Sequence, residues 1–219
     1  MIELPTIALH IAAQFCPAKK DLKATLEGIR LRPCSSDPRR IELLATNGII
    51  GVCLSFDHSH DLVPIQEDVP SAPFLKAKDG GTIINRREDS RLYDVEIVHN
   101  GRQVLTVESL HSLPDHMQQV LGLGEAFDNH IVGDFRRWFF DPALMMVPLK
   151  IAQKWGDGKV LCLRSVQNRA CVFQISLDLP LIYNAVMQWC IMPISVRDSA
   201  AYCNDPHVNY SILHKEEAS

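Results

Sequence analysis

The stretch ELLATNGIIGV, residues 42–52, decides how the first half of the chain folds. It contains two apolar runs, and the four-residue turn Ala45-Thr46-Asn47-Gly48 joins them. Asn47 and Gly48 both tolerate the positive φ angles of a tight turn, so an Asn-Gly pair between apolar runs is a strong hairpin signal. The sequence therefore predicts two antiparallel strands, at about 40–46 and 49–56, joined at this turn.

Other segments have the same strand-like composition. A second Asn-Gly pair within residues 93–110 lies between two alternating runs, which predicts another hairpin. Residues 6–15 are apolar and compatible with a strand, although their alanines leave the assignment open. Residues 57–81 contain prolines, acidic residues and a Gly-Gly pair, which indicate a long surface connection. Further strands are expected at 29–33, 81–85, 130–140, 159–166, 169–177 and 188–196.

Two segments carry helix signals. The first, at about 17–28, has apolar residues at helical spacing on one face and is expected to end at Gly28. The second, at about 141–158, has Asp141 as its N-cap and Pro142 at the first helical position. Pro148 inside this segment predicts a kink or a later start. Because strands outnumber helices and short turns join many of them, the sequence predicts an α+β fold with antiparallel sheets.

The composition is typical of a globular intracellular protein. The chain has 219 residues, of which 47% are hydrophobic, which is enough for one large domain or two small ones. No run approaches the roughly 20 apolar residues of a membrane-spanning helix, and the N-terminus has no secretory pattern. The seven cysteines form no Cys-x-x-Cys pair, which favours reduced, buried thiols. We therefore expect a cytoplasmic protein without a membrane partner.

The net charge is −4, but basic residues gather around the two predicted helices. These residues are Lys19, Lys20, Lys23, Arg30, Arg136, Arg137, Lys150 and Lys154. They could be ordinary solvated residues on helix faces. Alternatively, both helices present them to one polyanion, because long lysine side chains contact phosphates without reading bases. In that case the protein would bind nucleic acid in a salt-sensitive, sequence-independent way.

No catalytic motif is present in the sequence. It contains neither a nucleophile elbow, nor a phosphate-binding loop, nor a dinucleotide-binding fingerprint. We therefore expect a binding protein rather than an enzyme, and no cofactor. The strongest metal candidate is the pair His58 and His60 with a carboxylate of Asp57 or Asp61. A metal-dependent hydrolase that uses His58, His60 and Asp61 is therefore one alternative function.

Three short motifs occur in a fixed order along the chain. The hairpin turn reads ATNG, the segment SLPDHMQQVL contains Pro114 and Asp115, and WCIMPISV contains a Met-Pro pair. In the same order they resemble the Ala-Thr-Asp-Gly-type turn, the Phe-Pro-Asp-Tyr linker and the C-terminal Met-Pro-Met strand of the bacterial DNA polymerase III β subunit, the sliding clamp. Residues 57–81 fit this resemblance poorly.

The resemblance implies a peptide-binding pocket. In the clamp family, the turn and the C-terminal strand line a hydrophobic pocket that receives short peptides of DNA polymerases and clamp loaders. The corresponding residues here are Thr46, Gly48, Ile49, Ile50, Met192, Pro193 and Ile194. An apolar groove can bind an extended peptide through a few buried side chains. The two isoleucines replace a His-Arg pair of the family and could instead be core residues.

The resemblance also implies a ring. Clamp modules place antiparallel sheets outside and helices on the inner face, around duplex DNA, and subunits join head to tail through edge strands. The two basic helices would then face the DNA. Family rings contain six modules, so clamp-like modules at 1–115 and 116–219 would make a homotrimer. One module with an insertion at about 57–130 would instead make a hexamer.

The function that the resemblance implies is a processivity factor for DNA replication. Its partners would be duplex DNA, polymerase and clamp-loader peptides, and further copies of the same chain. The reduced size relative to the bacterial clamp favours a phage or plasmid origin. The other function in this class is a clamp-like adaptor or decoy that binds clamp-motif peptides without forming a ring.

Overall fold

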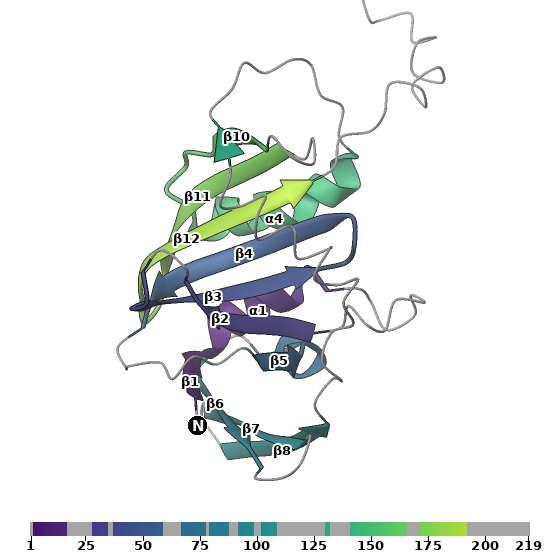
Figure 1. The fold of residues 1–219 in the computed structure, drawn as a ribbon, viewed down its shortest axis with the longest axis vertical. Coiled ribbons are helices and arrows are strands. Elements are labelled where there is room, and N and C mark those ends of the chain that lie inside the picture. The colour runs from purple at the N-terminus through teal and green to yellow at the C-terminus, as the bar shows by residue number, and fades with distance from the viewer. Residues whose placement is uncertain are drawn as a thin grey trace, which may run out of the picture.

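The computed structural model of the chain describes residues 2–16, 28–34, 37–58, 67–77, 79–87, 92–98, 102–108, 130–131, 141–165 and 171–191. These residues form two antiparallel β-sheets, two α-helices and one 3₁₀ helix (Figure 1). The smaller sheet has four strands, in the order β1 (Ile2–Pro5), β6 (Gly81–Arg86), β7 (Leu92–Val98) and β8 (Arg102–Glu108). The predicted α+β fold with antiparallel sheets is therefore confirmed, and β7 and β8 pair as the second predicted hairpin.

The larger sheet has eight strands and joins the two halves of the chain. Its order is β5 (Glu67–Pro70), β2 (Gly28–Pro33), β3 (Arg40–Thr46), β4 (Ile50–Asp57), β12 (Ile182–Ile191), β11 (Cys171–Leu179), β10 (Leu161–Ser165) and β9 (His130–Ile131). Strands β3 and β4 form the hairpin predicted from the Asn-Gly turn, with Thr46 opposite Gly51. Strands β4 and β12 meet in the middle of the sheet, where Val52 pairs with Trp189. Strands from both halves of the chain thus share one continuous hydrogen-bond ladder.

Helix α1 (Thr6–Ala13) occupies the segment that the sequence suggested as a strand. Seven of its eight residues are buried, and it packs against β2, β3, β4 and the 3₁₀ helix η2 (Ala72–Leu75). A half-buried strand would alternate apolar and polar residues, whereas this segment has no such alternation and is rich in alanine, which favours a helix. The expectation of a strand at residues 6–15 is therefore wrong.

Helix α4 (Pro142–Trp155) is the predicted second helix. The Asp141 side chain accepts a hydrogen bond of 2.8 Å from the backbone N–H of Ala143, and Pro142 occupies the first turn, as predicted. The helix begins at Pro142 and continues through Pro148, so the later start that this proline suggested is wrong. Helix α4 packs on β11, which lies two strands from the β9 edge of the larger sheet.

Both helices lie on one face of the larger sheet (Figure 1). Ile151 and Ala152 of α4 belong to the same hydrophobic cluster as the buried residues of α1. On β4, the alternate residues Val52 and Leu54 join this cluster, because successive side chains of a strand point to opposite faces. The core therefore runs along the helix face of the sheet, across the β4–β12 junction.

The described cysteines agree with the expectation of reduced thiols. None of the six described cysteines, Cys16, Cys34, Cys53, Cys162, Cys171 and Cys190, forms a disulfide. Cys53, Cys171 and Cys190 are buried, and burial raises the pKa of the Cys190 thiol to about 12. A thiol with such a high pKa is almost entirely protonated near neutral pH and reacts slowly.

The helix predicted at about 17–28 lies outside the described residues, apart from Gly28. Gly28 begins β2, so the strand that was expected to follow this helix is confirmed. None of the helices in the described part of the chain is both long and apolar enough to cross a membrane.

Candidate functional site

Side-chain hydrogen bonds hold the β3–β4 turn. Thr46 Oγ1 accepts a hydrogen bond from the Gly48 N–H and donates one to the Ile50 carbonyl oxygen, both at 2.9 Å. Asn47 Oδ1 accepts hydrogen bonds of 3.0 Å from the backbone N–H groups of Ile49 and Ile50. Gly48 has a φ of 89°, whereas Asn47 keeps a negative φ. The predicted hairpin is therefore confirmed, but Asn47 stabilises it as a side-chain acceptor and not through a positive φ.

The end of β12 lies beside this turn. Ile191 pairs with Ile50, and residues 192–194, which carry the Met-Pro segment, follow directly in the sequence and lie outside the described residues. Ile50 is only 4% exposed and belongs to the core, whereas Ile49 is 51% exposed. The sheet thus brings the turn next to the residue that precedes the Met-Pro segment. Peptide binding at these residues stays a prediction.

The basic residues of α4 are exposed. Lys150 and Lys154 lie about one helical turn apart on the surface of this helix. The Lys154 ammonium lies 4.4 Å from the ring centroid of Trp155, within the distance of a cation–π contact. Met146 and Leu149 are also exposed on α4. The exposed surface of α4 therefore combines two cations with two apolar side chains.

The other predicted DNA-binding residues are placed differently. Arg30 lies on β2 between the buried Ile29 and Leu31, so its side chain points to the sheet face opposite the helices. Helix α1 contains no lysine or arginine. The structure therefore brings Lys150 and Lys154 together but does not place Arg30 with them. Lys19, Lys20, Lys23, Arg136 and Arg137 lie outside the described residues.

The metal candidate is described only in part. The His58 ring makes a hydrogen bond of 3.1 Å between Nε2 and the backbone oxygen of Glu3, while His60 and Asp61 lie outside the described residues. Among the residues that the structure does describe, no three or more His, Cys, Asp or Glu side chains are grouped so that they could hold a metal ion. The arrangement of described residues therefore offers no support for a hydrolase site.

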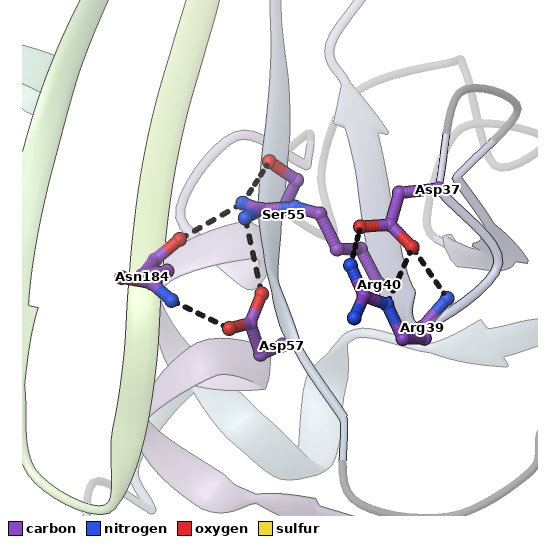
Figure 2. A network of polar contacts seen from close by, with 6 residues as sticks. All are labelled: Asp37, Arg39, Arg40, Ser55, Asp57 and Asn184. Carbon is purple, nitrogen blue, oxygen red and sulfur yellow. Dashed lines mark hydrogen bonds and ion pairs between the residues drawn. The ribbon is translucent and has the colours of Figure 1, made fainter.

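A polar network that the sequence did not predict lies at the other end of β4 (Figure 2). Arg40 on β3 donates to Asp57 Oδ1 and Ser55 Oγ, both at 3.1 Å, and to the Asn184 carbonyl oxygen at 2.8 Å. The Asn184 amide donates to Asp57 Oδ2 at 2.6 Å. The network ties β3, β4 and β12 together. The hairpin register, in which Arg40 lies opposite Asp57, was a sequence signal that could have revealed the ion pair.

We expect Arg40→Met to lower the free energy of unfolding by about 1–2 kcal/mol, because it removes three hydrogen bonds of a charged group while keeping the aliphatic stem. Urea unfolding measures the change. The matched control is Arg39→Met, whose guanidinium bonds only to Asp37 in the described structure and is 85% exposed. Arg39 lowers the pKa of Asp37, but an exposed pair of this kind should add no measurable stability. Equal effects of the two substitutions would contradict the network.

Comparisons with known proteins give a match by structure only. No protein-family model and no curated protein matches the chain. Among solved structures, a DNA polymerase sliding clamp from Pseudomonas aeruginosa with ligand superposes with a TM-score of 0.55 at 14% identity, over 89% of this chain and 66% of that chain. The DNA polymerase III subunit beta from Bartonella birtlesii bound to griselimycin gives a TM-score of 0.54 at 14% identity, over 89% and 66%.

A third match is the DNA polymerase sliding clamp from Bacillus subtilis, with a TM-score of 0.53 at 12% identity, over 89% of this chain and 64% of that chain. The chain therefore spans slightly less than two thirds of the length of these clamps. Identities of 12–14% show the fold alone. The antiparallel sheets with two helices on one face are accordingly a divergent version of the sliding-clamp fold.

Proposed function

We propose that this chain is a clamp-like processivity factor, which encircles duplex DNA as a ring of identical subunits and holds replication proteins on it. The observation that carries this proposal is the fold, which superposes on DNA polymerase sliding clamps over 89% of the chain. A ring of this kind needs no tight contact with DNA, because its topology retains it. It needs only a cationic inner face, a way to close, and a docking site for clients.

The exposed cations of α4 support the DNA-facing role. Lys150 and Lys154 lie on the sheet face that carries both helices, which is the inner face in the proposed ring. Lysine ammonium groups on long side chains contact phosphates without fixing a register on the duplex, so such contacts permit sliding. Because α1 itself has no lysine or arginine, the cations of the first half would come from Lys19, Lys20 and Lys23.

The length of the match supports two modules. The chain spans 64–66% of the length of the matched clamps, as two of three modules would. We propose modules at 1–115 and 116–219, whose strands β4 and β12 pair across the junction. A ring of six modules then contains three chains. Pairing between chains would satisfy the backbone groups of the outer strands of the sheets.

The client site in this proposal is the end of the sheet at the β3–β4 turn. Ile49 is exposed there, the turn is held by side-chain hydrogen bonds, and β12 ends beside it at Ile191. We propose that Thr46, Gly48, Ile49, Ile50, Met192, Pro193 and Ile194 receive an extended peptide of a polymerase or a clamp loader. Ile50 would support the site from the core, and Ile49 would contact the peptide directly.

The absolute mass in solution tests the ring. Light scattering at micromolar concentration should give three times the 24.6 kDa of one chain for a trimer. Topology is tested by incubating the protein with a linear duplex, blocking both ends, and washing in high salt. A ring is retained on the blocked duplex and lost from an unblocked one, whereas ordinary phosphate binding is lost from both. A strict monomer that still binds clamp-motif peptides would replace the ring with an adaptor.

We expect the double substitution Lys150→Glu and Lys154→Glu to weaken DNA association at low salt and to reduce its dependence on salt. Each phosphate contact that is lost should reduce the slope of log K against log salt by about 0.9. Fluorescence anisotropy with a short duplex measures both quantities. The control is Lys76→Glu, because Lys76 is an exposed lysine next to η2 and not on α4. The DNA-facing role of α4 is wrong if both variants weaken binding equally.

A further inference from the structure

A cavity of about 650 Å³ lies at the end of β4 opposite the β3–β4 turn. Its walls come from four parts of the chain: β1, the end of β4, the start of β6 and the β11–β12 hairpin. The eight residues of β4 span roughly 23 Å at about 3.3 Å per residue, so the cavity and the turn are well separated. We call this cavity the hairpin pocket, defined by Glu3, Phe56, Asp57, Leu181, Tyr183 and Asn184.

The β11–β12 hairpin holds two large apolar side chains in the solvent at the rim of the hairpin pocket. Leu181 is 80% exposed and Tyr183 is 78% exposed. Leu181 has a φ of 63°, in the left-handed region that glycine and asparagine tolerate far better than leucine. Neither burial nor backbone preference therefore accounts for a leucine at this position.

A β-bulge in the pairing of β11 with β12 lies at the rim of the hairpin pocket. Leu177 pairs with Ala185 and Leu179 with Ile182, so β12 has one more residue than β11 between these pairs. Asn184 lies within this bulge and has a φ of 52°. Bulges redirect side chains and are frequent next to functional sites. The Asn184 amide and carbonyl groups bond to Asp57 and Arg40, so the bulge is fixed to β4 and β3.

The charge of the hairpin pocket is negative. The Asp57 carboxylate forms an ion pair of 3.1 Å with the Arg40 guanidinium, which neutralises its charge. Glu3 is exposed, and in the described part of the structure its carboxylate has no hydrogen-bond or ion-pair partner. The Glu3 carboxylate lies close to β6: a Cβ atom added at Gly81 would be 3.6 Å from Glu3 Oε1. Glu3 therefore places an uncompensated negative charge beside apolar and aromatic groups.

We infer that the hairpin pocket binds an arginine or lysine side chain, flanked by apolar residues, of a peptide segment in a partner protein. The cation pairs with the Glu3 carboxylate, and its planar or aliphatic part lies against the exposed Tyr183 ring. A flanking apolar residue covers Leu181, which removes its exposed surface from water. The inference does not depend on a ring, and it gives the two ends of β4 separate binding partners.

The test uses the full chain and three dye-labelled, capped tripeptides: Leu-Arg-Leu, Leu-Lys-Leu and the neutral analogue Leu-citrulline-Leu. Fluorescence anisotropy gives the affinities, and amide chemical shifts locate the site. We expect both cationic peptides to bind more tightly than the citrulline peptide, by about fivefold, the size of a partly exposed ion pair. The largest shifts should fall on Glu3, Leu181 and Tyr183.

Two variants separate recognition from folding. Glu3→Gln should lower the affinity for the arginine peptide to that for the citrulline peptide. Leu181→Asn should lower the affinity for all three peptides. It should not lower the midpoint of thermal unfolding, because asparagine tolerates a positive φ. The control, Asp141→Asn, also removes one carboxylate but keeps the cap of α4 and lies at the end of that helix remote from the hairpin. It should leave binding unchanged.

Three results would overturn the inference. The first is equal affinity for the arginine and citrulline peptides. The second is unchanged binding by both Glu3→Gln and Leu181→Asn. The third is concentration-dependent self-association that the peptides do not displace but Leu181→Asn abolishes, since the occupant would then be a second copy of this chain. None of these results bears on whether the chain encircles DNA, so this inference and the proposed function can fail separately.

Discussion

Trp189→Ala should lower the free energy of unfolding by about 3–5 kcal/mol, the range measured for removing large aromatic side chains from protein cores. Trp189 is fully buried in the middle of the larger sheet. Its ring stacks on Phe173 of β11 with centroids 5.2 Å apart, and its backbone pairs with Val52 of β4. The substitution therefore opens a cavity at the junction between the two halves of the chain.

Trp189→Phe is the control that separates the volume of the ring from its polar atom. The indole N–H of Trp189 is buried and has no hydrogen-bond partner in the described structure. Phenylalanine keeps the stacking partner and removes a donor whose burial is costly, so we expect it to cost less than half as much as alanine. Urea unfolding followed by circular dichroism measures both values. An alanine variant that loses less than about 1.5 kcal/mol would show that the junction is poorly packed.

Local signals in the sequence predicted the hairpins correctly. The Asn-Gly pair at Asn47 and Gly48 fixes where β3 ends and β4 begins, because few other dipeptides turn a chain so tightly. The second Asn-Gly pair predicted the β7–β8 pairing in the same way. Asp141 and Pro142 located the start of α4, since capping is decided within one turn of helix. In each case the interacting residues are neighbours along the chain.

Tertiary contacts decided what the sequence could not predict. Helix α1 is apolar on nearly every side because the sheet and η2 cover it, so it lacks the polar face by which helices are recognised. The pairing of Val52 with Trp189 joins strands that lie far apart in the sequence, and no local pattern encodes that choice.

The candidate sites follow the same division. The β3–β4 turn was found from its residues, whereas the hairpin pocket combines Glu3, Asp57 and Leu181 from three distant segments. The left-handed conformation of Leu181 was unpredictable, because leucine is among the residues that rarely adopt it. The grouping of Arg30 with the lysines of α4 rested on a helix face, and the strand at β2 turned its side chain to the other side of the sheet.

The second large effect is expected for Gly156→Ala, which should lower the free energy of unfolding by about 2–3 kcal/mol, the upper part of the range for overpacking. Gly156 caps α4: its N–H donates to the Ala152 carbonyl oxygen at 2.8 Å, and its backbone forms a β-bridge with Leu177 of β11. A Cβ atom there would lie 2.3 Å from Ile175 Cδ1 and 2.5 Å from the Ala152 oxygen. The isoleucine can move, but the backbone oxygen cannot move without breaking the last turn of the helix.

Gly158→Ala is the matched control, because it tests backbone strain without crowding. Gly158 has a φ of 81° and nothing within 4 Å of an added Cβ, so alanine should cost about 1 kcal/mol for the left-handed conformation alone. Gly156 has a φ of −82°, which alanine adopts freely, so its larger cost must come from packing. If Gly158→Ala lowers the free energy of unfolding more than Gly156→Ala does, α4 does not pack as closely on β11 as the structure shows. This close packing fixes the helix that carries Lys150 and Lys154. If the chain binds DNA as proposed, Gly156→Ala should also weaken that association, whereas Gly158→Ala should not.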